Sequence, residues 1–132
     1  MKLQIPPNCD LTLGLICVDK AIPGTSVWTM RVDDRFMNPA GIIQGGFLAA
    51  MADSAMGASV VTSLGERKVS VANTEMKVSL IRAATVGDEL TCTARVLKPG
   101  SVISFVEARI VDQSKRLIAT ASSTYLIKER TE

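Results

Sequence analysis

Histidine is absent from the 132 residues of this sequence, and its absence removes several kinds of chemistry. Without imidazole there is no Ser-His-Asp or Cys-His catalysis, no histidine ligand for a metal and no histidine switch near neutral pH. Any reaction must use carboxylates, amides, hydroxyls, thiols and backbone groups. We expect neither a metal nor a cofactor.

Aromatic residues and unbalanced charge are also scarce. The chain has one Trp, one Tyr and three Phe, which offer few platforms for stacking single-stranded bases. Fifteen Lys and Arg residues against thirteen Asp and Glu give a net charge of +2, and the basic residues are scattered. We therefore expect no nucleic-acid partner.

Cysteine is sparse as well, since Cys9, Cys17 and Cys92 are an odd number with no CxxC pair. This pattern predicts neither a disulfide framework nor a zinc site. With no signal peptide visible, we expect a reducing, cytoplasmic setting. Asp53 interrupts the longest apolar stretch, so no run approaches the roughly 18–20 residues that span a bilayer, and no membrane partner is expected.

The length and an apolar fraction of 47% predict one globular domain, residues 1–132. Residues 1–12 are read as a loose lead-in or a short helical turn. Runs rich in β-formers, bounded by turn residues, predict strands at 13–19, 26–33, 69–82, 89–98, 102–112 and 116–128. The last four are expected to form an antiparallel meander. Such a sheet needs one face covered and leaves edges exposed, so we expect an α+β fold that dimerises edge to edge.

One segment, from Gly45 to about Leu64, changes to helical periodicity. It is rich in small residues and apolar nearly all round, which is typical of a helix buried on several sides. Gly65 is a suitable C-terminal stop. We expect a helix of about 19 residues, roughly 28 Å long, that covers the sheet.

Asp53 is the only acid in this apolar helix. A carboxylate at such a position loses hydration unless it is paired or catalytic. One interpretation is a general base or nucleophile in an apolar pocket. The alternative is that one side of the helix meets water, which Ser54, Ser59 and Thr62 would support.

The entrance to the helix carries further polar groups. Free backbone N–H groups of Gly45 and Gly46 at a helix N-terminus can stabilise a bound anion or a developing oxyanion. An ordinary N-terminal turn explains the two glycines equally well. Asn38, which precedes Pro39, is either a turn residue or an amide donor to a carbonyl.

Asn73 and Glu75 lie inside the longest β-rich run. Strict alternation would put these two side chains on one face of the strand and Thr74 on the other. For Glu75 we favour a solvated strand face.

Together these residues resemble the hotdog-fold thioesterases, in particular the PaaI-type acyl-CoA thioesterases and their 4-hydroxybenzoyl-CoA thioesterase relatives. The resemblance covers roughly residues 13–127. It rests on residues that occur in the family order and spacing: Asn38, Gly41, Gln44-Gly45-Gly46, Asp53, the run from Asn73 to Ala83, and Gly87-Asp88. It implies a long central helix wrapped by a curled antiparallel sheet, dimers that pair their sheets, and often a dimer-of-dimers tetramer.

The resemblance also implies roles for residues at the helix. Asn38 and the N–H of Gly45 would polarise the thioester carbonyl. Asp53, from the other subunit of the dimer, would activate water or attack the carbonyl directly. Gln44 and Gly46 would contact the substrate.

Two further positions follow from the family pattern. Asn73 stands where the family usually has Ser or Thr, which helps to place the water. Arg82 stands where the family often has Arg-Pro after the strand. The surfaces around Arg82 and the loop at 98–101 are where CoA phosphates would bind.

Two departures from the pattern stand out. The family usually has His-Gly-Gly, and here Gln44 replaces the histidine, which is generally taken as a positioning residue and not as the base. A Gln amide still donates and accepts hydrogen bonds but cannot carry a proton charge. Asn73 in place of Ser or Thr can hold a water but has a larger side chain.

The predicted function is therefore hydrolysis of an acyl-CoA thioester. The small residues of the helix could leave space for an aryl or medium-chain acyl group, or could equally let the helix pack tightly on the sheet. The alternative is a non-catalytic acyl-CoA-binding protein of the same fold. A hydratase or dehydratase is disfavoured because those enzymes usually pair Asp or His with His. A purely structural protein is the fourth reading.

Overall fold

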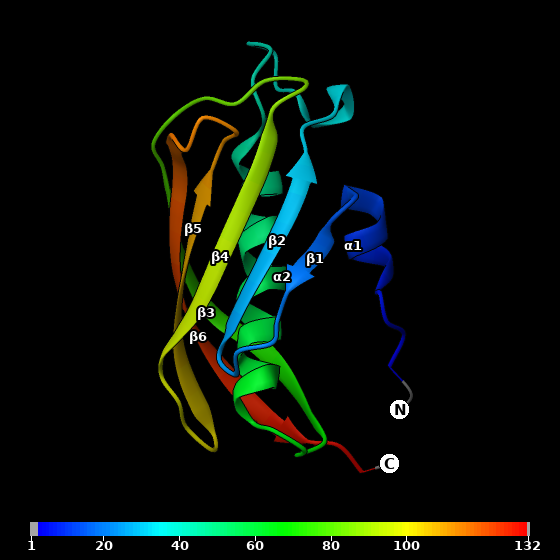
Figure 1. Ribbon diagram of the computed structural model, residues 1–132, viewed down its shortest axis with the longest axis vertical. Helices are drawn as coiled ribbons and strands as arrows, with labels where there is room; N and C mark the ends of the chain where they lie inside the picture. Colours follow the sequence, from blue (N-terminus) through cyan, green and yellow to red (C-terminus); the bar gives the residue numbers. More distant parts are fainter. Residues whose placement is uncertain (1–2, 132) are drawn as a thin grey trace.

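The computed structural model describes residues 3–131, and within them one long helix lies against a curled sheet (Figure 1). The chain begins with a short helix, α1, Asn8–Leu13. Strands β1, Ile16–Asp19, and β2, Thr25–Arg31, lead to the long helix α2, Gly45–Ser63. Strands β3, Val69–Leu80, β4, Glu89–Lys98, β5, Ile103–Val111, and β6, Leu117–Glu129, complete the fold. The predicted α+β class, with a central helix in a curled antiparallel sheet, is confirmed.

The six strands pair in the order β1-β2-β4-β5-β6-β3, and all the pairs are antiparallel. The prediction that the last four strands form a simple meander was wrong. Only β4, β5 and β6 follow one another in the sheet, whereas β3 crosses to the far side of β6 and β4 pairs with β2. Propensity and alternation specify that a segment is a strand but carry no information about its neighbour, so the sequence left this order undetermined.

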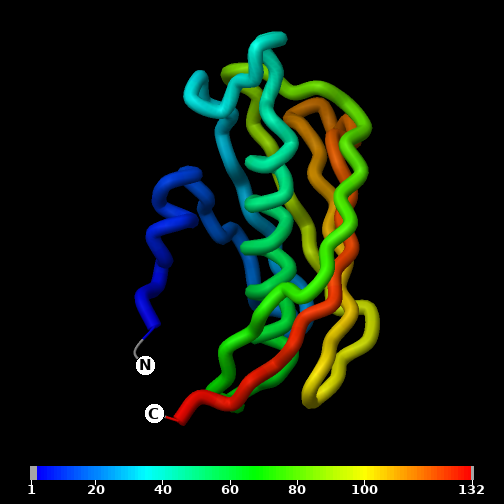
Figure 2. The backbone as a smooth tube through the Cα atoms, turned by 180° about the vertical axis from the view of Figure 1, so that it is seen from behind, coloured from blue at the N-terminus to red at the C-terminus, as the bar shows by residue number. Residues whose placement is uncertain are grey.

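Helix α2 lies in the concave face of the sheet and contacts five of its strands (Figure 2). Its buried side chains form one stripe that packs against the sheet: Leu48, Met51, Ala52, Ala55, Met56, Ser59 and Val60. The small residues in this stripe allow the helix to pack closely on the strands. The opposite stripe, which contains Asp53, Gly57 and Val61, is half-buried or exposed. The single chain therefore covers the helix on one side, although the helix is apolar nearly all round.

The N-terminal residues depart from the predicted strand at 13–19. Leu13 ends helix α1, Gly14 turns the chain with a φ of 68°, and the strand begins only at Ile16. A positive φ of this size is readily adopted by glycine and marks a helix C-terminus. The prediction of a short helical turn in residues 1–12 is confirmed by α1, which begins at Asn8.

Strand β3 contains a β-bulge that overturns the predicted alternation. Asn73 pairs with Tyr125 and Glu75 with Thr124, so Thr74 is the extra residue. Asn73 is half-buried on the helix side, while Glu75 is exposed. These two side chains do not share a face, because a bulge shifts the alternation by one residue. The solvated position favoured for Glu75 is confirmed.

Among residues 3–131 there is no helix with the length and apolarity needed to cross a membrane. The cysteines Cys9, Cys17 and Cys92 are free thiols.

Candidate active site

Asp53 lies in the third turn of α2, on the side of the helix that the sheet does not cover. Its side chain is exposed, so the residues of this chain do not enclose it in the apolar pocket that the sequence predicted. The carboxylate is nevertheless held in place. Two side chains from neighbouring strands donate hydrogen bonds to its Oδ1 atom, Asn73 from β3 and Tyr125 from β6.

The amide of Asn73 is the centre of a small polar cluster below Asp53. Its Nδ2 lies 3.1 Å from Asp53 Oδ1 and 3.2 Å from Ser123 Oγ. The same nitrogen lies 3.3 Å from the phenol oxygen of Tyr125 and 3.6 Å from Met76 Sδ. The bulge at Thr74 lets Asn73 point toward the helix while the rest of the strand keeps its register. The structure thus brings together Asn73 and Asp53, which the sequence singled out separately.

Tyr125 is buried, with 2% of its surface exposed, and its hydroxyl contacts both the carboxylate and the backbone carbonyl of Asp53. Burial raises the pKa of the Tyr125 phenol above its ordinary value, and the hydrogen bond to the Asp53 carboxylate raises it further. The phenol therefore keeps its proton at any working pH and acts as a permanent donor.

A large apolar cavity of about 700 Å³ opens beside Asp53. It is lined by the exposed side of α2, by the N-terminal segment and by strands of the sheet. The lining residues include Asp53, Gly57, Ala58, Val61, Trp28, Val71 and Tyr125. Ser54 Oγ donates a 2.7 Å hydrogen bond to Asp10 Oδ1, which joins α1 to α2 at the edge of this cavity. The N-terminal segment therefore forms one of its walls.

A second, smaller pocket of about 250 Å³ lies at the N-terminus of α2, and Asn38, Gly45 and Arg82 all line it. Asn38 Oδ1 accepts hydrogen bonds from the backbone N–H groups of Ala40 at 2.9 Å and Ile42 at 3.3 Å. The Asn38 carbonyl oxygen thus fixes the loop, while its NH₂ group remains the donor that a ligand can use. Both interpretations of Asn38, as turn residue and as donor, therefore fit the geometry.

The first turn of α2 has no side-chain cap. Gln44 occupies the N-cap position, but its side chain makes no capping hydrogen bond, so the N–H of Gly45 is not satisfied in that way. Unsatisfied N–H groups at a helix N-terminus attract negative charge. The side chain of Gln44 is exposed, and neither Gln44 nor Gly46 lines the pocket that holds Asn38 and Gly45.

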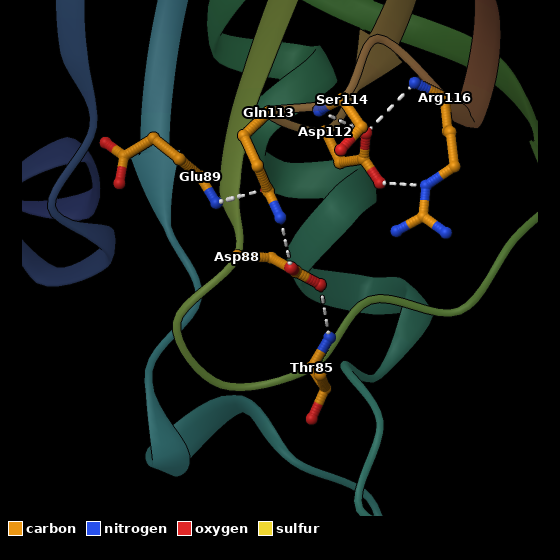
Figure 3. A network of polar contacts seen from close by, with 7 residues as sticks. All are labelled: Thr85, Asp88, Glu89, Asp112, Gln113, Ser114 and Arg116. Atoms are coloured by element: carbon orange, nitrogen blue, oxygen red, sulfur yellow. Dashed lines mark hydrogen bonds and ion pairs between the residues drawn. The ribbon is translucent and has the colours of Figure 1, made fainter.

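A network of hydrogen bonds fixes the loop between β3 and β4, which forms one wall of this smaller pocket (Figure 3). Asp88 accepts hydrogen bonds from the backbone N–H of Thr85 and from Gln113 Nε2, both at 2.9 Å. Gln113 Oε1 in turn accepts from the N–H of Glu89 at 3.1 Å. Further along the loop, the carbonyl of Ala84 accepts from Ile43 N at 2.8 Å. The Gly-Asp turn therefore fixes the wall that carries Arg82.

The two polar groups of the site are separated in one chain. Gly45 and Asp53 are eight residues apart on α2, which corresponds to about 12 Å along the helix axis. Arg82 and the loop at 98–101 are also far apart. Arg82 comes after the end of β3 and the loop comes after the end of β4, and these two strand ends lie at opposite ends of the sheet (Figure 1). A single chain therefore presents two half-sites, one with Asn38 and Gly45 and one with Asp53, Asn73 and Tyr125.

Sequence reasoning missed Tyr125, Ser123 and Asp10. Tyr125 is the only tyrosine in the chain and lies within an apolar strand pattern, where a hydroxyl needs a partner. That signal could have marked Tyr125 as a residue of interest, but not its partner. The thiol of Cys92 can be set aside as a nucleophile, since burial raises its pKa to about 12.

One long helix in a curled antiparallel sheet, with a carboxylate fixed on the helix, defines a protein of the hotdog fold. The family model described as "Thioesterase superfamily" matches residues 40–119, and the chain belongs to this family. The matched range contains Gly45, Asp53, Asn73 and Arg82.

Individual relatives agree with this assignment. The chain is 29% identical to acyl-coenzyme A thioesterase 13 of Homo sapiens over 119 residues, which cover 89% of this chain and 83% of the relative. The structure of S. sahachiroi AziG is similar, with a TM-score of 0.86 and 26% identity, and covers 96% of this chain and 100% of that one. The E. coli PaaI protein from the phenylacetic acid degradation operon shares the fold, with a TM-score of 0.85, 23% identity, and coverage of 92% and 84%.

Proposed function

We propose that this protein hydrolyses acyl-CoA thioesters to a carboxylic acid and CoA. Its membership of the thioesterase family and its similarity to an acyl-coenzyme A thioesterase support the reaction class. The observation that carries the proposal is the pair of half-sites, because one supplies hydrogen-bond donors for a carbonyl oxygen and the other supplies a fixed carboxylate. Together the two half-sites can polarise the carbonyl and activate the attacking group.

The half-site at the start of α2 would bind the thioester carbonyl. The N–H of Gly45 and the NH₂ of Asn38 would donate to the carbonyl oxygen, which becomes negatively charged as the tetrahedral intermediate forms. Donors fixed in advance stabilise that charge more than they stabilise the ground state, and each such donor contributes about 2.7–4 kcal/mol. The helix N-terminus adds a favourable dipole.

Asp53 would supply the attacking group in one of two ways. As a general base, its carboxylate takes a proton from water while the water oxygen bonds to the carbonyl carbon. As a nucleophile, it forms an acyl anhydride that water then hydrolyses. In both routes the C–S bond breaks, the thiolate of CoA leaves and takes up a proton, and Asp53 is regenerated.

Completion of the site requires a second copy of the chain. The gap of about 12 Å between Gly45 and Asp53 exceeds the reach of one carbonyl group and its attacking water. Strand β3 is a long sheet edge in this topology, and a long exposed edge favours pairing with another chain. We infer a homodimer in which Asp53 of one protomer meets Asn38 and Gly45 of the other, with a dimer of dimers as the larger assembly.

The substrate is expected to extend in two directions from the thioester. Arg82 is exposed beside the smaller pocket and makes no ion pair with residues 3–131, so it is available to a CoA phosphate. The loop at 98–101, at the other end of the sheet, could contribute only from another copy. The apolar cavity beside Asp53 suits an aryl or medium-chain acyl group. A cytoplasmic location is supported by the three free cysteines.

Hydrolysis of a panel of aryl-, short-, medium- and long-chain acyl-CoAs, followed by detection of the released thiol, tests this function. We expect the wild-type protein to hydrolyse part of the panel and Asp53→Asn to lose at least 100-fold in kcat, the order associated with one essential acid–base group. Glu66→Gln, which likewise turns a carboxylate into an amide, lies at an exposed site in the turn after α2 and outside the proposed dimer edge, so it is the matched control and should retain wild-type activity. If the wild-type protein hydrolyses no member of the panel, the result would favour the alternative function, a non-catalytic acyl-CoA-binding protein. An active Asp53→Asn would exclude the proposed mechanism.

A further inference from the structure

We propose that Tyr125 is a positioning residue for Asp53, which fixes the carboxylate through one oxygen and leaves the other for the reaction. This inference rests on the proposed function, because it assigns to Tyr125 a role at the same site. The family pattern that identified Asp53 and Asn73 does not include Tyr125.

The contacts of Tyr125 place it directly behind the carboxylate. Its hydroxyl reaches Asp53 Oδ1 from β6, and it also lies 2.9 Å from the backbone carbonyl oxygen of Asp53. The single hydroxyl hydrogen of Tyr125 therefore faces both the side-chain oxygen and the backbone oxygen of the same residue. A partner that contacts both restricts the side-chain rotamer of Asp53 relative to the helix axis, which a contact to the carboxylate alone would not do.

The two oxygens of Asp53 have different surroundings. Tyr125 and Asn73 both donate to Oδ1, and within residues 3–131 neither they nor other groups donate to Oδ2. Oδ1 thus faces the sheet. Oδ2 is left without a donor, and in an exposed side chain on the cavity wall it is the oxygen that can accept a proton or bond to a carbonyl carbon.

The support behind Tyr125 is rigid. The ring is buried between α2 and the sheet, and Asn73 Nδ2 donates to its oxygen at 3.3 Å. Because the phenol keeps its proton, as its raised pKa indicates, it remains a donor throughout the reaction. A catalytic group held by a packed second residue needs little reorganisation when the substrate binds.

The arrangement also gives the substitution at Asn73 a physical meaning. Where Ser or Thr offers one hydroxyl donor, the Asn73 amide nitrogen has two hydrogens, and Asp53, Tyr125 and Ser123 all lie within hydrogen-bond distance of it. Its Oδ1 is buried and has no partner among the described residues. The bulge at Thr74 directs this amide inward. In this chain, Asn73 therefore acts together with Tyr125 in holding Asp53.

Kinetics of Tyr125→Phe on a substrate that the wild-type protein hydrolyses test the role. We expect kcat to fall by roughly 10- to 100-fold with KM nearly unchanged, the range for losing one hydrogen bond to a charged group. Ser104→Ala is the matched control, because Ser104 pairs with Tyr125 across β5 and β6 and its buried hydroxyl has no partner in the described chain. It should keep wild-type kcat. Unchanged kcat in Tyr125→Phe, or an equal loss in Ser104→Ala, would overturn the inference.

A spectroscopic measurement separates this inference from the proposed function and does not require Tyr125→Phe to fold. With ¹³C at the tyrosine Cζ, the single tyrosine gives one NMR signal. Asp53 is the ionisable side chain that accepts from its hydroxyl among residues 3–131, so the signal should move when Asp53→Asn replaces that carboxylate with an amide. It should stay at the wild-type position in Glu66→Gln, which removes an exposed carboxylate outside the cluster. An Asp53→Asn signal at the wild-type position, or an equal displacement in Glu66→Gln, would overturn the pairing whether or not the protein hydrolyses acyl-CoA.

Discussion

At the scale of single residues, Gln44 is the residue that departs most from the family pattern. Its backbone begins α2 with a ψ of 138°, and its N–H bonds to the carbonyl of Phe36 at 2.9 Å. Its side chain is exposed, forms no cap and does not line the smaller pocket. The contribution of Gln44 in this structure is therefore made by its backbone.

Replacement of this side chain should consequently have a limited effect. We expect Gln44→His to change kcat/KM by less than about tenfold, since a histidine can occupy the N-cap position with the same backbone. Steady-state kinetics with the best acyl-CoA of the panel would measure the change. A gain well above tenfold would show that the Gln44 side chain limits the reaction, and that it contacts the substrate in the assembled site.

At the scale of secondary-structure elements, the entrance to α2 links stability and activity. A Cβ built at Gly46 meets no atom within 4 Å, so alanine fits without strain. Because alanine has the higher helix propensity, Gly46→Ala should raise stability by roughly 0.5 kcal/mol. At Gly45, by contrast, the Cβ would lie 2.5 Å from Leu80 Cδ1.

The two readings of the glycine pair predict different activities for Gly46→Ala. If the thioester approaches the first turn of α2, the added methyl group obstructs it, and we expect a lower kcat/KM together with a higher Tm. Thermal unfolding and kinetics on the same preparation would show both. If Gly46→Ala is more stable and fully active, Gly46 is part of an ordinary N-terminal turn of α2 and does not contact the substrate.

The β5–β6 turn offers a test of stability against pH. Burial opposes ionisation of Asp112, but the backbone N–H and side chain of Arg116 and the N–H of Ser114 donate to its carboxylate and hold its pKa below the ordinary value. A carboxyl whose pKa is lower in the folded state stabilises the fold above its unfolded pKa of about 3.9. That contribution is lost as the pH falls through the folded value.

Asp112→Asn should therefore unfold at a lower urea concentration than the wild type at pH 7. The difference between the two midpoints should narrow once the pH falls below about 4. Glu66→Gln, which replaces an exposed acid outside the proposed dimer edge, is the control and should follow the wild type across the range. If the difference in urea midpoint between Asp112→Asn and the wild type stays constant with pH, the lowered pKa of Asp112 in the folded state would be contradicted.

The elements also show what the sequence could predict. Helix α2 and strand β4 begin where periodicity and turn residues placed them, because those signals are local. The place of β3 beside β6 and the bulge at Thr74 depend on contacts between distant segments, so local patterns could not specify them. The same distinction applies to the site. Asp53 was visible as an acid in an apolar helix, whereas Tyr125 acquires its role only when β6 packs beneath α2.

At the scale of the whole molecule, the fold explains why one helix can carry two separate half-sites. The sheet curls around one side of α2 (Figure 2), and Asp53 is on an exposed part of the helix. The donors at the start of α2 lie about 12 Å from that carboxylate. A two-fold dimer in which the helices run in opposite directions would bring the start of one helix near the middle of the other. We therefore propose the dimer as the functional unit.

The activity of mixed dimers, made from two inactive variants, tests most directly whether the site is shared between two chains. Asp53→Asn lacks the carboxylate, and Asn38→Ala lacks a carbonyl donor, so each homodimer should have little activity. A mixed dimer would contain one site with both residues intact. Refolding the two variants together at equal amounts should restore about one quarter of wild-type activity, because half of the dimers are mixed and each has one intact site. If the mixture is no more active than the separate variants, although mixed dimers have formed, the site does not combine Asp53 of one chain with Asn38 of the other.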